Sequence, residues 1–227
     1  MLEALSAFFA QYGNLLREGT IDTLIMVSVT TVFAYLLGLP LGVLLNITKP
    51  DGIWPHKGFN SVVGWITNLG RSLPFLILMI LLLDFTKLIV GTKIGVRGAI
   101  VPLIISATPF VARMVESSLA EVDSGVQEAA QSMGATVPQI VFKVLLPEAM
   151  PSLTLGGSIS MVTILAYTAI AGTIGAGGLG DLAIRYGYNR KVASMMWASV
   201  IILVILVQII QSVFSFVSRK IDKRVRL

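Results

Sequence analysis

Three glycines, Gly175, Gly177 and Gly180, have the G-x-G-x-x-G spacing with which many proteins bind the phosphates of dinucleotides. That motif needs a preceding strand, a following helix and an acidic residue about 20 positions later. Here a long uncharged segment precedes the glycines, and no acidic residue occurs between Asp181 and Asp222. We therefore interpret these glycines as a loop or a helix end, and not as a nucleotide site.

Two further patterns suggest hydrolytic chemistry and fail on their missing partners. Gly178-Leu-Gly-Asp181 resembles the G-x-G-D motif of intramembrane aspartyl proteases, which need two carboxylates at membrane depth. The only other candidate is Asp84, which lacks the tyrosine that precedes this aspartate in that family. Gly156-Gly-Ser-Ile-Ser160 departs from the G-x-S-x-G serine motif at its last position, and no intramembrane histidine could activate Ser158.

Other catalytic and metal chemistry is excluded by composition. The chain has no cysteine, and its single histidine, His56, cannot build a multi-histidine metal site. No lysine is followed by serine or threonine, so the chain has no P-loop for ATP. We predict no catalytic residue, no metal site and no cofactor on this chain. Energy for any active process must come from a partner or an ion gradient.

The elements that would position any site are membrane spans. Hydrophobic residues make up 55% of the 227 residues and charged residues 13%, and the mean hydropathy is +0.86. A spanning helix needs about 20 mostly apolar residues. The sequence therefore predicts a single domain, residues 1–227, that is an all-α integral membrane protein with about five transmembrane helices. The predicted spans lie near residues 23–48, 58–83, 97–115, 149–172 and 192–218, the fourth ending at its glycines near Gly172.

Arg71 is the one charge that falls well inside a predicted span and away from its ends, and intramembrane charges usually face a cavity or a partner group. Arg71, Ser158 and Met161 are accordingly our candidates for a pathway or gate. The alternative is that the second span begins later and Arg71 lies at the interface. Arg97 and Arg113 flank the short third span, and we expect both to extend along the helix ends toward the headgroups.

The charge distribution at the two ends predicts an orientation. A basic tail follows the last span, with Arg219, Lys220, Lys223, Arg224 and Arg226 within the last nine residues. Basic residues next to spans are typical of the cytoplasmic side and of contact with anionic lipid, so we do not interpret the net charge of +5 as nucleic-acid binding. Five spans then place the N-terminus outside. Apolar residues at helical spacing before the first span predict an interfacial helix: Leu2, Leu5, Phe8, Phe9, Tyr12, Leu15 and Leu16.

The longest polar segment, residues 116–148, reads as two short capped helices on the cytoplasmic side. Ser124 with Gln127 predicts a capping box, followed by an apolar face and a glycine cap; the face is Val126, Ala129, Ala130 and Met133, and the cap is Gly134. Thr136 with Gln139 predicts a second start, and Pro147 and Pro151 should stop that helix. An apolar face on such an element predicts a protein partner.

The same segment resembles a known family. Glu128-Ala-Ala-Gln-Ser-Met-Gly134, nine residues and Val144-Leu-Leu146-Pro147 are similar to the E-A-A loop of binding-protein-dependent ABC importer permeases, with Val144 in place of the usual isoleucine. The resemblance implies coupling residues that dock on a cytoplasmic ATPase: Glu128, Ala129, Ala130, Gly134, Val144, Leu146 and Pro147. It also implies a bacterial inner-membrane homodimer, two ATPase subunits that hold ATP and Mg²⁺, and an external substrate-binding protein.

Within that family, three strings are most similar to the permeases that import methionine. They are Arg71-Ser-Leu-Pro-Phe-Leu-Ile-Leu-Met79, Ala107-Thr-Pro-Phe-Val-Ala-Arg113, and Gly175-Ala-Gly-Gly-Leu-Gly180 followed by Arg185-Tyr-Gly-Tyr188. The resemblance implies import of methionine, in its L form or in both its L and D forms. One alternative is an ABC permease for another small polar solute. The other is a secondary carrier, but the E-A-A loop, the lack of repeats and the lack of paired intramembrane ion-coupling residues argue against a secondary carrier.

The loop residues carry two further expectations. We expect Gly134 to let the chain turn where a larger residue would strain or clash. Glu128 is expected to pair with a basic or amide group of the ATPase, with a cap on its own loop as the alternative.

Overall fold

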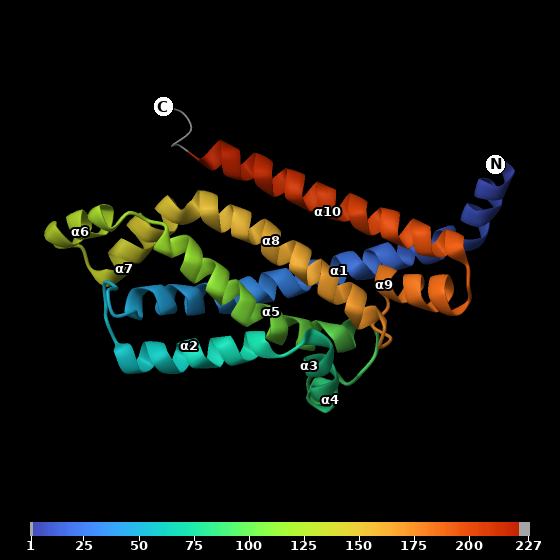
Figure 1. Cartoon of the computed structure of the whole chain (residues 1–227), viewed down its shortest axis with the longest axis horizontal. Coiled ribbons are helices and arrows are strands. Elements are labelled where there is room, and N and C mark those ends of the chain that lie inside the picture. The colour runs from blue at the N-terminus through green and yellow to red at the C-terminus, as the bar shows by residue number, and fades with distance from the viewer. Residues whose placement is uncertain (1, 223–227) are drawn as a thin grey trace. The chain divides into compact units, whose positions relative to one another are not determined.

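The structure, a computed structural model, describes residues 2–222, in which helices joined by short loops make up the regular structure and no strand occurs. The basic residues Lys223, Arg224 and Arg226 and the side chains of Leu2 and Leu5 lie outside the described part. Figure 1 shows the order of the elements. They are α1 (Leu2–Thr48), α2 (Lys57–Ser72), α3 (Phe75–Leu81), α4 (Leu83–Val90), α5 (Gly95–Ala120), α6 (Ser124–Ser132), α7 (Val137–Ile140), the π-helix η1 (Val141–Leu145), α8 (Leu146–Gly172), α9 (Gly178–Leu182), the π-helix η2 (Ala183–Asn189) and α10 (Ala193–Ile221).

Four helical stretches are long and apolar enough to cross a membrane. They are Ser6–Thr48, Gly95–Ala120, Val137–Gly172 and Ala193–Ile221, and α2 with α3 makes a fifth if that bent pair counts as one span. The predicted all-α fold with about five spans is confirmed. The third helix is longer than predicted, because α5 runs on from the predicted end at residue 115 to Ala120.

The second predicted span, residues 58–83, is not one helix. It breaks between α2 and α3, where Leu73 has extended dihedrals, with φ −81° and ψ 124°. The following Pro74 explains the break, since the proline ring disfavours helical dihedrals in the residue before it. Arg71 consequently lies in the last turn of α2 and is exposed.

The chain forms two compact units, and the first comprises Met1–Val32, Pro74–Ile105 and Met161–Ile210. The Phe75 ring stacks on Tyr167 with centroids 4.7 Å apart, within a buried apolar cluster. The short helix α9 packs against α1, where the Leu179 amide donates to the Thr23 hydroxyl over 2.9 Å. At Gly180 a Cβ atom would overlap the backbone of Ala169, so this approach of α9 to α8 requires glycine.

The N-terminal segment does not form the separate interfacial helix that we expected. It continues into the first span as one helix, α1, of 47 residues. Phe8, Tyr12 and Leu15 pack against a buried cluster of Leu16, Leu182 and Met195. Most of the apolar face predicted for the lipid interface is therefore used for packing within the first unit, whereas Phe9 is exposed.

The second unit comprises Phe33–Leu73, Ser106–Ser160 and Gln211–Leu227. Close packing of α1 on α5 depends on Gly42, where a Cβ atom would lie 2.5 Å from the carbonyl oxygen of Ala112. Hydroxyl groups connect the other helices: Ser152 donates to Ser118 over 3.2 Å between α8 and α5, and Ser218 of α10 donates to the Pro151 carbonyl over 3.1 Å. Asn60 of α2 donates to the Leu45 carbonyl over 2.8 Å.

Arg113 forms a polar junction between α5 and α2 in this unit. Its guanidinium lies 2.6 Å from the Glu116 carboxylate, and donates to the Gly64 carbonyl over 3.0 Å and to the Asn68 amide oxygen over 2.9 Å. The expectation that Arg113 extends toward the headgroups from a helix end is wrong, because the helix continues beyond it and its charge is satisfied by partners inside the unit. A charge within an apolar span is costly unless it is paired in this way.

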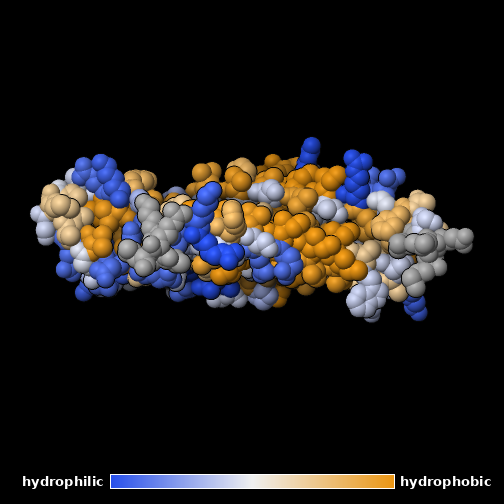
Figure 2. All heavy atoms as spheres, turned by 90° about the horizontal axis from the view of Figure 1, so that it is seen from above, coloured by the Kyte–Doolittle hydropathy of each residue, from blue (hydrophilic) through white to orange (hydrophobic). Residues whose placement is uncertain are grey.

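Much of the surface of α10 is apolar and exposed, although Met195 and Ser218 near its two ends pack against the rest of the chain. None of the residues in its most hydrophobic window is buried. Figure 2 shows hydrophobic residues over a broad area of one face of the molecule. The exposed large hydrophobic residues of α10 are Trp197, Val200, Ile201, Val204, Ile205, Ile209, Val213, Phe216 and Val217. Such a surface is stable against lipid or against another protein, and not against water.

Candidate functional site

The coupling element, which we define as residues 123–147, begins with a cap on α6. Asp123 is the N-cap residue, and its side-chain oxygen accepts a hydrogen bond from the Gly125 amide over 2.7 Å. The predicted capping box of Ser124 with Gln127 is wrong by one residue, since Ser124 is already helical and Gln127 instead donates to the Val122 carbonyl over 3.3 Å. Aspartate and serine are equally good N-cap residues, so their order alone did not decide between them.

A glycine turn separates α6 from α7. Gly134 has φ +78°, and the Ala135 amide donates to the Ala130 carbonyl over 3.1 Å, which closes the end of α6. The side chain of Gln139 accepts from the Thr136 amide over 2.8 Å, so the predicted start at Thr136 is confirmed. No described heavy atom lies within 4 Å of a Cβ built at Gly134. Of the strain or clash that we expected from a larger residue, the structure shows the backbone strain, and the described residues leave room for a side chain.

The second helix of the element does not stop at the two prolines. Helix α7, η1 and α8 follow one another without a break, so that Val137–Gly172 is one helical stretch of 36 residues. Pro147 lies in the first turn of α8 and Pro151 lies inside it. Prolines are tolerated in membrane helices because neighbouring groups and local changes of hydrogen bonding satisfy the backbone. The coupling element thus continues without a break into a candidate membrane span.

The inner side of the element is buried and its outer side is apolar and exposed. Ala130, Ile140 and Leu145 are buried, the last two almost completely. By contrast Val126, Met133 and Phe142 are 44%, 81% and 70% exposed. Large apolar side chains exposed on one short helical element are typical of a docking surface.

The structure brings all seven predicted coupling residues into this one element. Glu128, Ala129, Gly134 and Pro147 are exposed, Val144 and Leu146 are half-buried, and Ala130 is buried. Phe142 was not predicted as part of the surface. The sequence did contain a signal, a large aromatic residue that lies between the two helix caps of the element and Pro147. A comparison restricted to the residues of a motif does not consider such a residue.

The three pathway candidates lie on two elements. Arg71 ends α2, where its guanidinium lies 6.0 Å from the centre of the Phe110 ring, while Ser158 and Met161 belong to α8. Ser158 is buried and Met161 is half-buried. Their role in a pathway stays a prediction.

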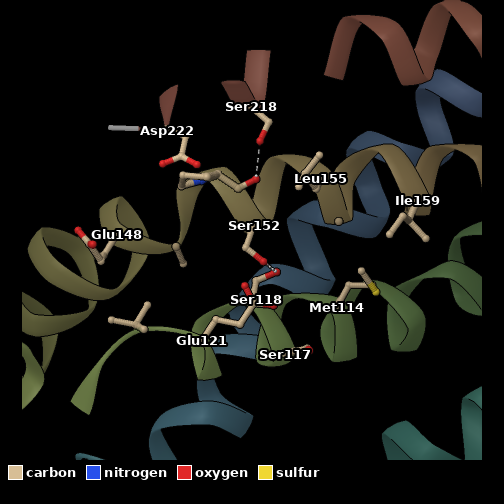
Figure 3. A pocket seen from close by; sticks show the side chains of 14 residues that line it. Met114, Ser117, Ser118, Glu121, Glu148, Ser152, Leu155, Ile159, Ser218 and Asp222 are labelled. Carbon is tan, nitrogen blue, oxygen red and sulfur yellow. Dashed lines mark hydrogen bonds between the residues drawn. The ribbon is translucent and has the colours of Figure 1, made fainter. Parts of the chain in front are cut away.

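A pocket of about 420 Å³ lies beside the first turns of α8 and against α5 and the end of α10 (Figure 3). Ser118 and Ser152 point toward one another in it, and its lining includes the carboxylates of Glu121, Glu148 and Asp222. An amino acid carries both an ammonium and a carboxylate group, so this acidic lining neither selects nor rejects it, and we assign no ligand to the pocket.

Comparison with known proteins identifies relatives for almost the whole chain. The family described as "Binding-protein-dependent transport system inner membrane component" matches residues 38–227. The "Probable D-methionine transport system permease protein MetI" of Vibrio cholerae is 50% identical over 220 residues, which are 97% of this chain and 98% of that protein. The "Methionine import system permease protein MetP" of Bacillus subtilis is 47% identical over 181 residues, 80% of this chain and 82% of that protein.

The fold has a solved counterpart. A chain of the structure titled "Inward facing conformations of the MetNI methionine ABC transporter" superposes with a TM-score of 0.92 at 44% identity, over 93% of this chain and 98% of that one.

Proposed function

Because the chain belongs to the family of binding-protein-dependent transport system inner membrane components, we propose that it is the permease subunit of an ATP-driven methionine importer. The observation that carries the substrate is that relatives up to 50% identical, over up to 97% of the chain, are named for methionine transport. The names of several relatives specify D-methionine, so we propose that both stereoisomers are carried.

In this proposal ATP is hydrolysed by another subunit. The chain has no P-loop, and ATP with Mg²⁺ is bound by two cytoplasmic ATPase subunits. The coupling element supports this arrangement, because it is capped, exposes Val126, Met133 and Phe142, and continues as a helix into α8. A force applied to such an element moves the span to which it is joined.

The rest of the assembly follows from the surfaces. The apolar face of α10 supports contact with lipid and with a second copy of the chain. We propose a homodimer in the bacterial cytoplasmic membrane that receives its substrate from an external binding protein. The basic tail supports an orientation with the N-terminus outside and both the C-terminus and the coupling element in the cytoplasm.

The substrate is tested by uptake in cells from which this chain has been deleted. We expect loss of high-affinity uptake of labelled L- and D-methionine, with recovery when the chain is supplied in trans. Uptake of an unrelated amino acid serves as the control. Normal methionine uptake in the deletion strain, together with a defect for another amino acid, polyamine or ion, would refute the assignment.

The docking surface is tested with a matched pair of aromatic substitutions. Phe142 on the coupling element is 70% exposed, and Phe9 on α1, near the end proposed to lie outside, is 54% exposed. A phenylalanine buried at an interface contributes about 1.5–3 kcal/mol, so Phe142→Ser should weaken ATPase binding by about 10- to 100-fold. Phe9→Ser should leave ATPase binding unchanged. Equal ATPase capture by both variants would show that this surface is not the docking site.

A further inference from the structure

The helix that joins the coupling element to its span contains one turn of a different kind. In η1, which covers Val141–Leu145, the amide of Leu146 donates to the carbonyl of Val141, five residues earlier. An α-helix makes this bond to the residue four positions earlier. A π-turn therefore holds one residue more than an α-helical turn in the same place, and such turns occur frequently at functional sites.

Pro147 disfavours an α-helical turn at this point of the helix. In a continuous α-helix the carbonyl of Lys143 would meet the nitrogen of Pro147, which has no hydrogen and whose ring would collide with that carbonyl. In a π-turn each carbonyl is directed toward the residue five positions later, so the carbonyl of Lys143 is turned away from the proline. The extra residue is thus accommodated where an α-turn is disfavoured.

The turn also fixes which side chains face outward. Val141 and Leu145 are buried at 6% and 0% exposure, whereas Phe142 between them is exposed. Helix α6 contacts both α7 and η1, so the whole element moves with this turn. A slip of one residue in an α-helix rotates everything on one side of it by about 100° and shifts it by about 1.5 Å. Phe142, Met133 and Val126 would then point away from a partner placed to receive them.

We propose that Pro147 is a positioning residue for coupling: by holding the π-turn of η1, it sets the rotational register of the docking surface relative to span α8. This inference rests on the proposed coupling function and adds to it a specific role for the proline. Pro151 provides a comparison on the same helix, since it lies one turn later inside α8 and no π-turn precedes it. A proline alone therefore does not produce a π-turn, and the surplus residue before Pro147 is also needed.

The test combines removal of the proline with removal of the surplus residue. Pro147→Ala permits a regular α-helix but keeps the extra residue, so the docking surface loses its register. The double variant also lacks Lys143, an exposed residue of the turn. Its helix has no extra residue and can be a regular α-helix, so the docking surface and α8 keep their original directions relative to one another. Lys143→Ala controls for loss of the lysine side chain, and Pro151→Ala controls for loss of a proline from the same helix.

The assay uses the complete transporter in proteoliposomes and measures ATP hydrolysed per methionine imported. Pro147→Ala should hydrolyse ATP without coupled uptake, the double variant should regain wild-type coupling, and both controls should remain coupled. Normal coupling in Pro147→Ala, or no recovery in the double variant, overturns the proposal. If Pro147→Ala does not reach the membrane, the double variant alone decides, because it must insert and couple.

The outcome is distinguishable from a failure of the coupling assignment itself. If Phe142→Ser binds the ATPase and imports normally, the element is not the docking surface. If Phe142→Ser fails while Pro147→Ala couples normally, the docking surface stands and only the role of the proline is wrong.

Discussion

Substitutions at Gly134 separate the folding role of this residue from its place in an interface. The backbone there has φ +78°. An L-residue in this left-handed conformation costs about 1–2 kcal/mol, and asparagine adopts it more readily than other residues. No described heavy atom lies within 4 Å of an added Cβ, so the strain is the only cost within the chain. Gly134→Ala and Gly134→Trp should therefore lower the stability of the isolated permease by the same amount.

The two variants should differ once the ATPase is present. If the ATPase covers the turn after α6, the indole of Gly134→Trp has no room in the interface, whereas the methyl group of Gly134→Ala adds little bulk. Each 1.4 kcal/mol lost at the interface is about tenfold in affinity. We expect Gly134→Asn to behave almost as wild type, Gly134→Ala to be mildly impaired, and Gly134→Trp to lose coupled uptake.

The assay measures three quantities for each variant: the amount in the membrane, co-purification of the ATPase, and methionine uptake. Equal membrane levels with a graded loss of ATPase binding support the reasoning. Full ATPase binding and normal uptake in Gly134→Trp would refute it, because a docked partner could not then approach this turn. Equal loss in the alanine and tryptophan variants would also refute it, since strain alone would explain the result.

Three further predictions concern the charge junction, helix packing and orientation. Arg113→Gln should lower the free energy of unfolding in SDS by about 1.5–3 kcal/mol, because it removes charged hydrogen bonds. Arg97→Gln, on the exposed start of the same helix, should have little effect. Equal losses of stability in the two variants would contradict the polar junction at Arg113. Gly42→Leu should prevent folding, because its Cβ would lie 2.5 Å from a backbone oxygen. Gly58→Leu should be tolerated, because no heavy atom lies within 4 Å of the added Cβ. Size-exclusion chromatography in detergent distinguishes folded from aggregated protein for both variants. A cysteine replacing Glu128 in this cysteine-free chain should resist impermeant thiol reagents in intact cells and react in inverted vesicles, and the reverse pattern rules out the proposed orientation.

The features that the sequence predicted well are those decided by nearby residues. The end of α8 is one example, since Gly172 and the glycines after it stop a helix whatever lies around them, and the helix ends at Gly172. Likewise Thr136 and Gln139 are three residues apart and cap one another directly. Uncharged stretches of membrane length also depend only on local composition, so the number of spans could be predicted from them.

The features that could not be predicted depend on distant or competing groups. Arg113 looked like the end of a span because its partners on α2, Gly64 and Asn68, lie 49 and 45 residues earlier in the chain. Once those partners are present, the charge can remain inside a helix that continues to Ala120. Hydropathy alone places the boundary at the charge and therefore predicts α5 too short.

The two prolines after the coupling loop show how the same residue can have opposite meanings. In a soluble helix Pro147 would be a stop, and this rule led to the wrong prediction that the helix ends there. In the structure the chain accommodates the proline by changing the hydrogen-bonding pattern ahead of it, at η1, and the helix goes on. The proline rule for soluble helices does not anticipate this change, because the change depends on whether the chain ahead of the proline holds one residue more than an α-helical turn. The spacing between Gly134 and Pro147 in the motif includes the residues of α7 and of the π-turn, so in our proposal a change of that spacing by one residue would rotate the docking surface relative to α8 by about 100°.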